Sequence, residues 1–437
     1  MTMLELGYVS FPVLLIMIFL RAPIGLAMLL CGIGGLYFAM GGTSMFMAKL
    51  KTETYSTFSS YSLTIIPMFL LMGQFATLSG MSSALFKAAE SWLGHRKGGV
   101  AMAAVGACAG FGAICGSSLA TAATMSRVAL PELRRYGYSG GFSTATLAAG
   151  GTLGILIPPS VILVIYAILT EQNIAKLFLA AFVPGILAAL GYIITISIYV
   201  RMYPDAAGTR EAIPYPERVR ALLDVWPVLL VFGLVVGGIY LGWFTPTEGA
   251  AVGAAGTGLI ALISGNLNWQ VFVESIIATA SSTAMIFFIV LGAGLYNSFL
   301  ALTQVPQELS GWVVGLGLSP WMVLCLILVF YLIFGCLMDS LSMILLTIPI
   351  FFPVISALDF GMSPEHVAIW FGILVLIVVE VGLITPPVGM NLFIINAMDR
   401  STPMTQTYKA VMWFVTSDII RVMILVLFPA ITLFLIP

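Results

Sequence analysis

The chain has 437 residues, of which 60% are hydrophobic and only 8% charged, and its mean hydropathy is +1.10. Soluble domains carry about 25% charged residues, so this composition excludes a water-soluble protein and indicates one that crosses a membrane several times. The net charge of −1 gives no reason to expect nucleic-acid binding, and the five cysteines lie scattered in apolar segments, where they fit small packing residues.

The long apolar segments predict the spans. A helix that crosses a bilayer needs about 20 mostly apolar residues. The predicted spans in chain order are residues 7–20, 23–40, 63–78, 142–169, 178–200, 225–241, 249–264, 271–300, 367–397 and 410–436. Glu5 before the first apolar run and Arg21 after it favour a membrane span over a signal peptide. Residues 45–61 fit a helix at the membrane interface.

Two further apolar stretches, residues 99–130 and 320–358, are interrupted near their centres by small and polar residues. We interpret both as re-entrant helical hairpins, which enter and leave the membrane on the same side. Positive side chains flank the first hairpin and acidic side chains flank the second. The positive-inside rule therefore places the ends of the first hairpin in the cytoplasm and those of the second outside.

A Pro-Pro pair lies in the middle of two predicted spans, beginning at Pro158 in the first half and at Pro386 in the second. Proline removes a backbone donor and clashes with the preceding turn, so each pair should break its helix at mid-depth. Broken backbone inside a bilayer is tolerated only where the freed groups meet protein, water or a ligand. Two such breaks in corresponding positions indicate the binding site of a secondary transporter.

The two breaks are 386 − 158 = 228 residues apart, about half the chain, and the two hairpins enter from opposite faces. This pattern predicts an inverted repeat. The fold class is thus an all-α polytopic membrane protein with about ten to eleven transmembrane helices, two re-entrant hairpins and two Pro-Pro-broken helices. Residues 1–437 should form one unit, with a first repeat (1–200), a cytoplasmic connector (201–224) and a second repeat (225–437).

Gly116, Ser117 and Ser118 form the predicted tip of the first hairpin. Glycine permits unusual backbone angles, and the hydroxyls and freed carbonyls are hard oxygen ligands that suit Na⁺ better than a transition metal. The alternative is that small residues here only allow close helix packing. The Pro-Pro break expected to face the tip favours a functional role for the two serines.

Asp339 is the single charged residue between Glu308 and Asp359 in the second hairpin. An aspartate near the bilayer centre is costly unless it is paired, which favours a role near an ion or substrate. A compatible alternative is that it caps the helix that follows the tip. For Glu380, shortly before the second break, tuning of ion binding and a structural contact both remain open. We expect no arginine at mid-depth, so helix N-termini would hold an anion.

The sequence contains no metalloprotease HExxH motif, no P-loop and no dinucleotide-binding glycine motif in a strand–helix context. Neither histidine has an adjacent nucleophile. We therefore expect a protein that is not an enzyme. An integral-membrane enzyme would need convergent acidic, histidine or metal-ligating residues, and a pure scaffold subunit would not need two matched helix breaks.

Four motifs follow one another along essentially the whole chain. They are Gly-Ser-Ser-x-Ala at residues 116–120, Gly-x-x-Ile-Pro-Pro-Ser at 154–160, Asp339 followed by Pro349 and Pro353, and Glu-Val-Gly-Leu-Ile-Thr-Pro-Pro-Val-Gly-Met-Asn-Leu at 380–392. With these motifs the chain resembles the large membrane subunit (M- or DctM-type) of the tripartite ATP-independent periplasmic (TRAP) transporters.

The resemblance implies an elevator-type ion transporter fold in a bacterial inner membrane, with import of an organic acid coupled to an inward Na⁺ gradient and no other cofactor. It implies two protein partners, a small four-helix membrane subunit (Q-type) and a periplasmic substrate-binding protein (P-type). A stand-alone Na⁺/dicarboxylate symporter with a related hairpin fold is the alternative.

The resemblance also places site residues. Those expected around Na⁺ are Gly116, Ser117, Ser118, Pro158, Gly335, Asp339, Gly382, Thr385 and Gly389. Those expected around the substrate are Ser117, Ser118, Ser160, Asp339, Ser340 and Asn391.

Overall fold

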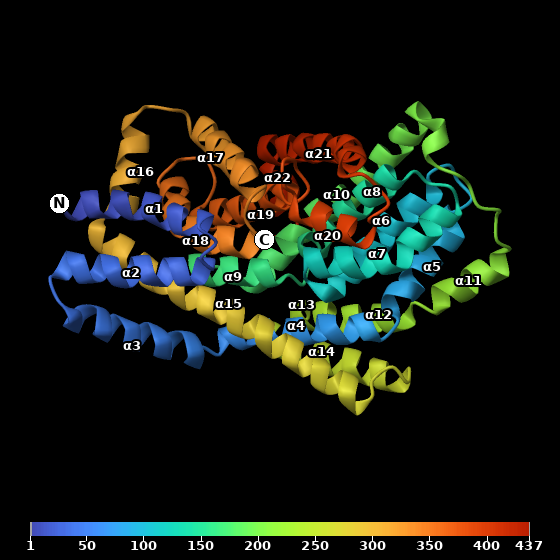
Figure 1. Cartoon of the computed structure of the whole chain (residues 1–437), viewed down its shortest axis with the longest axis horizontal. Helices are drawn as coiled ribbons and strands as arrows, with labels where there is room; N and C mark the ends of the chain where they lie inside the picture. Colours follow the sequence, from blue (N-terminus) through green and yellow to red (C-terminus); the bar gives the residue numbers. More distant parts are fainter. Residues whose placement is uncertain (1, 437) are drawn as a thin grey trace.

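The computed structural model describes residues 2–436, apart from the side chain of Met45, and their regular structure is helical (Figure 1). The helices of the first half are α1 (Met3–Phe19), α2 (Ile24–Met40), α3 (Thr43–Ser59), α4 (Ile65–Leu78), α5 (Met81–Leu93), α6 (Gly99–Cys115), α7 (Ser118–Arg135), α8 (Gly140–Leu156), α9 (Val161–Thr170) and α10 (Ile174–Met202). A short 3₁₀ turn, η1 (Ser62–Thr64), joins α3 to α4.

After a second 3₁₀ turn, η2 (Pro204–Ala206), the connector contains one short helix, α11 (Tyr215–Leu223). The second half has α12 (Trp226–Phe232), a π-helical turn η3 (Gly233–Gly237), α13 (Gly238–Tyr240), α14 (Pro246–Ile263), α15 (Trp269–Thr303), α16 (Val305–Gly315), α17 (Pro320–Gly335), α18 (Ser340–Ser356), α19 (Pro364–Gly382), α20 (Met390–Met398), α21 (Met404–Leu427) and α22 (Pro429–Leu433).

Five helices in the described range, α10, α14, α15, α19 and α21, are long and apolar enough to cross a membrane singly. Three bent helix pairs raise this number to as many as eight, and α1, α2, α6, α17 and α18 are shorter apolar helices. These lengths and compositions confirm the prediction of an all-α polytopic membrane protein.

The helices of the two halves follow one another in the same order. The five helices α6 to α10 correspond to α17 to α21, with offsets between their first residues from 320 − 99 = 221 to 404 − 174 = 230. The bent pair α3–α4 likewise corresponds to the long helix α15, and α2 to α14. The repeat expected from the two Pro-Pro pairs therefore extends over most of each half.

Contacts between the halves are reciprocal. Helix α2 packs along α15, and its counterpart α14 packs along α4. The short helix α9 contacts α18, and its counterpart α20 contacts α7, so the second part of each broken helix packs on the hairpin of the other repeat. Figure 1 shows α3, α4, α14 and α15 along one long side of the molecule. This exchange of partners is what an approximate two-fold relation between inverted repeats produces.

Helices α8 and α19 form the centre of the molecule. Every residue of α8 from Gly141 to Leu156 is buried, and so is every residue of α19 from Val367 to Gly382. A helix that is apolar on all sides is stable only when neighbours surround it, and the many small residues of α8 allow those neighbours to approach closely. Both helices end at a Pro-Pro break, and the first of these breaks is buried.

The structure differs from the sequence prediction in one predicted span and in two short helices. The span predicted at residues 410–436 is instead α21, which ends at Leu427, followed by the short helix α22 that begins at Pro429. Proline has no N–H to continue the ladder, and this explains the interruption. Helices α5 and α16, which were not predicted, are only 13 and 11 residues long, too short for a rule based on apolar spans.

Arg210 holds the connector (201–224) against the first repeat by an ion pair and a backbone hydrogen bond. Its guanidinium lies 2.9 Å from a carboxylate oxygen of Glu90 on α5, and its backbone N–H donates to the carbonyl of Gly94. The same guanidinium lies over the ring of Tyr136, directly after α7. One side chain thus joins the connector to α5 and to the end of the first hairpin.

Candidate functional site

Both hairpins reverse at a capped junction between two helices. In the first hairpin Gly116 has φ = 63°, a left-handed angle that glycine adopts without cost, and the Ser117 side chain accepts a hydrogen bond from the N–H of Ala120. In the second hairpin Asp339 caps α18 by accepting a 3.0 Å hydrogen bond from the N–H of Ser342. Ser117 and Asp339 are 222 residues apart (339 − 117), and each is the N-terminal cap of the helix that follows its tip. The structure thus confirms the hypothesis that Asp339 caps a helix.

Both breaks contain a cis Pro-Pro bond, and each is followed by a short helix, α9 after the first and α20 after the second. Ser160, fully buried, caps α9 by accepting from the N–H of Leu163, and Gly389 with φ = 68° precedes α20. The Thr385 hydroxyl donates to the carbonyl of Val381, 2.6 Å away. The N-termini of α9 and α20 therefore lie inside the protein, where their free N–H groups favour negative charge.

Paired glycines join each hairpin to the broken helix of its own repeat. A Cβ added to Gly112 of α6 would lie 2.5 Å from the Cα of Gly154 of α8. A Cβ added to Gly382 of α19 would lie 2.5 Å from the carbonyl carbon of Gly335 at the end of α17. Gly335 and Gly382, both predicted near Na⁺, thus bring the second tip and the second break into backbone contact.

Glu380 lies against the tip of the second hairpin. Its side chain has no exposed surface, and its Oε1 accepts a 2.6 Å hydrogen bond from the hydroxyl of Ser340, the first residue of α18. Ser118, the first residue of α7, is also buried. Ser118 and Ser340 occupy equivalent positions in the two repeats (340 − 118 = 222).

Several buried acceptor atoms near the breaks have no hydrogen-bond partner among the described residues. They are Oε2 of Glu380, Oδ1 of Asn391 and Oγ1 of Thr121. The amide of Asn391 donates to the carbonyl of Ala148 on α8 at 3.4 Å, which joins α20 to the first repeat. Buried oxygen atoms are normally satisfied by protein, water or ligand, so these three are available as cation or substrate ligands.

The predicted residues therefore fall into separate groups. Ser340 contacts Glu380, while Asn391 reaches α8 instead. The first break, at Pro158, is buried, whereas in the second break Pro386 is half-buried and Pro387 exposed. In this conformation only the second break is accessible from the surface. The sequence left the role of Glu380 open between tuning of ion binding and a structural contact, and it is not among the residues predicted around Na⁺ or substrate, although an acidic residue within an apolar span is a signal for function.

A buried arginine lies in the predicted span 410–436. Arg421 of α21 is 5% exposed, and its Nη2 lies 2.8 Å from Oδ1 of Asp418, which is 1% exposed. The Tyr192 hydroxyl donates to Oδ2 of Asp418 and lies 3.0 Å from the hydroxyl of Thr152 on α8. Thr152 is six residues before Pro158, as Glu380 is six before Pro386, so each broken helix has a buried polar contact at the same position.

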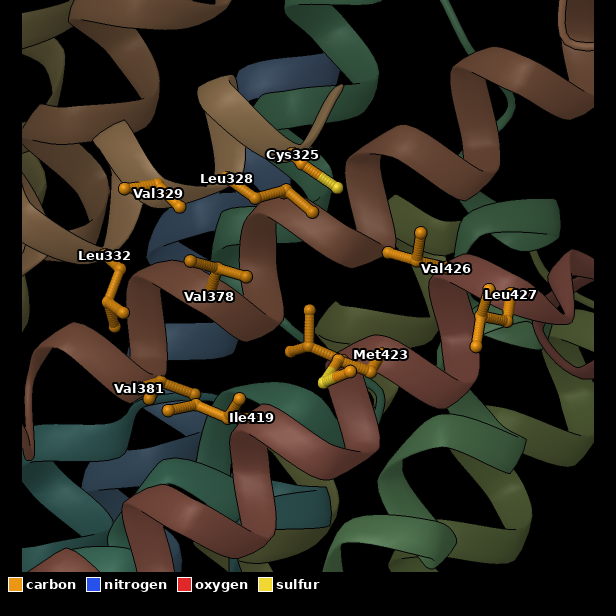
Figure 2. A pocket seen from close by; sticks show the side chains of 11 residues that line it. Cys325, Leu328, Val329, Leu332, Val378, Val381, Ile419, Met423, Val426 and Leu427 are labelled. Atoms are coloured by element: carbon orange, nitrogen blue, oxygen red, sulfur yellow. The ribbon is translucent and has the colours of Figure 1, made fainter. Parts of the chain in front are cut away.

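Figure 2 shows an apolar hollow that is unsuitable for an organic acid. It has a volume of about 280 Å³ and is lined from three helices, by Cys325, Leu328 and neighbours of α17, Val378 and Val381 of α19, and Met423 and neighbours of α21. All labelled side chains are apolar or a thiol, so none is a strong hydrogen-bond donor to a carboxylate. No group of three or more metal-ligating side chains is found among residues 2–436.

Inverted repeats, paired hairpins and interior helix breaks define the class of secondary membrane transporters. The family model for the tripartite ATP-independent periplasmic transporter, DctM component, matches residues 11–431, and the chain belongs to this family. A C4-dicarboxylate TRAP transporter large permease protein of Pseudomonas aeruginosa is 37% identical over 88% of this chain and 88% of its own. A sialic acid TRAP transporter large permease protein of Vibrio cholerae is 28% identical over 96% of both chains.

The fold also matches a solved structure, the YdaH transporter of Alcanivorax borkumensis. The TM-score is 0.63 with 14% identity, and the match covers 88% of each chain. At this identity the match supports the fold alone. Membership of the family confirms that the chain is the large membrane subunit of a TRAP transporter, and not an enzyme.

Proposed function

We propose that this subunit is the translocation pathway of a Na⁺-coupled importer of an organic acid. The observation that carries the proposal is the hydrogen bond of Ser340, at the tip of the second hairpin, to the buried carboxyl group of Glu380 beside the second break. Hydroxyls and carbonyls in a water-poor interior are the ligands that an alkali cation prefers. A relative is named for C4-dicarboxylates and another for sialic acid, and both are carboxylates.

The proposed Na⁺ sites lie at the two tips, next to the breaks. The ligands would be side-chain oxygens and the backbone carbonyls that the breaks free from helical hydrogen bonding. These ligands would be supplied by Gly116, Ser117, Ser118, Pro158, Gly335, Asp339, Gly382, Thr385 and Gly389. The proximity of Gly335 to Gly382, and of the Ser117 carbonyl to Gly154, supports this grouping.

The proposed substrate site lies between the two tips. Ser117, Ser118, Ser160, Asp339, Ser340 and Asn391 would contact the substrate. The N-terminus of α20 would hold the anionic group, because free N–H groups and the helix dipole favour negative charge. The partial exposure of Pro386 and Pro387 supports access to this side of the site.

The proposed mechanism is an elevator movement within a complex. The hairpins and broken helices, residues 99–170 and 320–398, would move as one body against α2, α4, α14 and α15. The reciprocal packing of α2 on α15 and of α14 on α4 supports a separate supporting framework. A small four-helix membrane subunit would complete this framework, a periplasmic binding protein would deliver substrate, and the complex would be located in a bacterial inner membrane.

Uptake into proteoliposomes tests the proposal. The vesicles would contain this subunit and its small partner, and labelled C4-dicarboxylates and sialic acid would be offered with and without an inward Na⁺ gradient and the binding protein. Uptake that requires both is the expected result. Uptake with Na⁺ alone would indicate a stand-alone symporter, and uptake without a Na⁺ gradient would refute Na⁺ coupling.

A further inference from the structure

Residues 94–98 join helix α5 to the first hairpin and form a short turn that begins and ends with glycine. Gly98 has φ = 75°, and α6 begins at the next residue. In the proposed elevator movement the mobile body begins at residue 99, so this turn is the joint between that body and α5. Glycine adopts many backbone angles, so a joint of this kind is held in one conformation by contacts from other segments.

The connector supplies these contacts, because it lies across both ends of the first hairpin. Where the chain enters the hairpin, the N–H of Arg210 donates to the carbonyl of Gly94 at 3.1 Å. Where the chain leaves it, the N–H of Ser139 donates to the carbonyl of Ala206 at 3.0 Å. Residues 206–210 of the connector therefore bridge the turn before α6 and the turn after α7.

The side chain of Arg210 crosses the joint. Its Nη1 lies 2.9 Å from Oε2 of Glu90 near the end of α5, and its guanidinium lies 5.8 Å from the centre of the Tyr136 ring, directly after α7. Glu90 is only 6% exposed, so this ion pair is better protected from water than a pair on the surface. Gly208 lies so close to Tyr136 that an added Cβ would overlap its carbonyl oxygen. One side chain thus holds α5 and the end of the hairpin together.

The surroundings of this ion pair allow it to open. Arg210 and Glu90 line a cavity of about 630 Å³ between α5, the end of α7 and the connector, and much of its lining is charged. Separation of the two charges does not require an apolar core to be broken, and water in the cavity can solvate both of them. Contacts of this kind can form in one conformation and be released in another.

We infer that Arg210 is a latch between α5 and the first hairpin, a positioning residue whose contacts with Glu90 and Tyr136 stabilise the conformation described here and are released when the hairpin moves. This inference rests on the proposed elevator movement. Only the first hairpin has such a latch, because no ion pair within residues 2–436 joins α16 to the second hairpin. In the latched conformation the second break is exposed at Pro387, so loss of the latch should reduce access to that break.

Hydrogen exchange of the purified full-length protein tests the latch without transport. Arg210→Ala should accelerate amide exchange at both ends of the hairpin, residues 94–99 and 136–140, by about tenfold, as expected for loss of a hydrogen-bonded ion pair. Arg210→Lys keeps the positive charge but not the planar group over Tyr136, so its exchange should be intermediate. Arg220→Ala, at an exposed arginine of the same connector, is the matched control.

Glu90→Gln provides a second variant in case Arg210→Ala does not fold. It keeps the shape of the buried side chain and removes its charge, so it should also accelerate exchange at both ends of the hairpin. Because the two residues act through one contact, Glu90→Gln added to Arg210→Ala should change exchange little further.

Thiol labelling reports the conformation at a distance from the latch. Val388→Cys places a thiol next to the exposed Pro387, and Cys325→Ser removes the exposed native cysteine. Labelling of position 388 by a soluble maleimide should slow about twofold or more in Arg210→Ala and in Glu90→Gln, because the conformation with an accessible second break becomes less populated. Arg220→Ala should label at the parent rate.

Three outcomes would overturn the inference. They are wild-type exchange at residues 94–99 in Arg210→Ala, additive effects of Glu90→Gln and Arg210→Ala, and unchanged labelling of position 388 despite faster exchange, which would make Arg210 a purely structural contact. Uptake that ignores a Na⁺ gradient would refute the proposed function, while exchange and labelling would still decide whether Arg210 is a latch.

Discussion

Asp339 combines two roles that different substitutions can separate. As the cap of α18 it accepts from the N–H of Ser342, and asparagine is an equally good cap. Asp339→Asn should therefore assemble with nearly wild-type stability but need more Na⁺ for half-maximal uptake, because a negative charge next to the proposed cation site is lost. Asp339→Ala should also lose about 1 kcal/mol of stability. Thermal unfolding and Na⁺-dependent uptake measure the two effects, and wild-type Na⁺ dependence in Asp339→Asn would exclude a coupling role.

Asp399 provides a pH-dependent link between the repeats. It lies in the loop after α20 and pairs with Arg134 at the end of α7. Burial alone would raise the pKa of Asp399, but hydrogen bonds from Ser401 and Thr402 and the charge of Arg134 outweigh it and lower the pKa below the ordinary value of 3.8. The folded protein then binds fewer protons here than the unfolded chain. The stabilisation is present above pH 3.8 and is lost as the pH falls through the lower, folded value.

Asp399→Asn should consequently be less stable than wild type at neutral pH. The difference between the two midpoints of thermal unfolding should shrink as the pH falls from about 5 to below 3.8. Glu365→Gln, at an exposed pair with Lys176, is a suitable control because exposed ion pairs contribute little. A difference that stays constant down to the lowest pH would contradict the assigned cause.

Single residues show how far the sequence predicts the site. Ser118, Ser340 and Asp339 were predictable because polar residues in an apolar stretch are costly without a role. The role of Glu380 was not, because its partner Ser340 is 380 − 340 = 40 residues away and only the fold brings the two together. Asp418 and Arg421, three residues apart, were overlooked because charged residues in an apolar segment resemble the end of a span, although α21 continues to Leu427.

At the scale of helices, the paired glycines make a prediction with an internal control. Gly112→Ala would place a methyl group 2.5 Å from Gly154, so α6 and α8 must separate, at a cost of about 1–3 kcal/mol. Gly106 lies on the same helix with nothing within 4 Å of an added Cβ, and Gly106→Ala should be neutral or stabilising. Thermal unfolding of both variants is the measurement. Equal effects of the two substitutions would show that α6 does not need its close contact with α8.

The buried pair of α21 predicts strong non-additivity. Removing only Arg421 leaves Asp418 as an uncompensated buried charge, which costs about 3–5 kcal/mol. Arg421→Gln should therefore unfold at a much lower temperature than wild type, and Asp418→Asn added to it should recover part of the loss. A double-mutant cycle on unfolding free energies measures the coupling. Additive effects would mean that the pair does not stabilise the contact of α21 with α10.

The breaks of the helices were easier to predict than the helices around them. The prolines determine where α8 and α19 end, because a missing N–H acts within a single turn, and α8 ends two residues before Pro158. The short helices α5 and α16 depend on neighbours that come from other parts of the chain, such as α11 for α5 and α18 for α16. Local pattern does not contain that information.

For the whole molecule, the repeat arranges the helices into two sets with different partners. Helices α2 and α4 pack on α15 and α14, whereas the broken helices α8 and α19 are surrounded by the hairpins and by α10 and α21. Because the repeats exchange packing partners, only a few helix pairs form contacts between the two sets. One of these is the contact of α4 with α6, where Gly73 lies beside Cys115 at the first hairpin tip.

This contact allows a direct test of movement between the two sets. A Cβ at Gly73 would lie 3.4 Å from Sγ of Cys115, so Gly73→Cys places two thiols within reach of a disulfide. If the hairpins move past α4 during transport, oxidation of Gly73→Cys should abolish uptake in proteoliposomes and reduction should restore it. Gly73→Ser, and Gly73→Cys combined with Cys115→Ser, carry similar bulk without the bond and should be insensitive to oxidant. Undiminished uptake by the cross-linked protein, with the bond verified by mass spectrometry, would exclude an elevator movement at this surface.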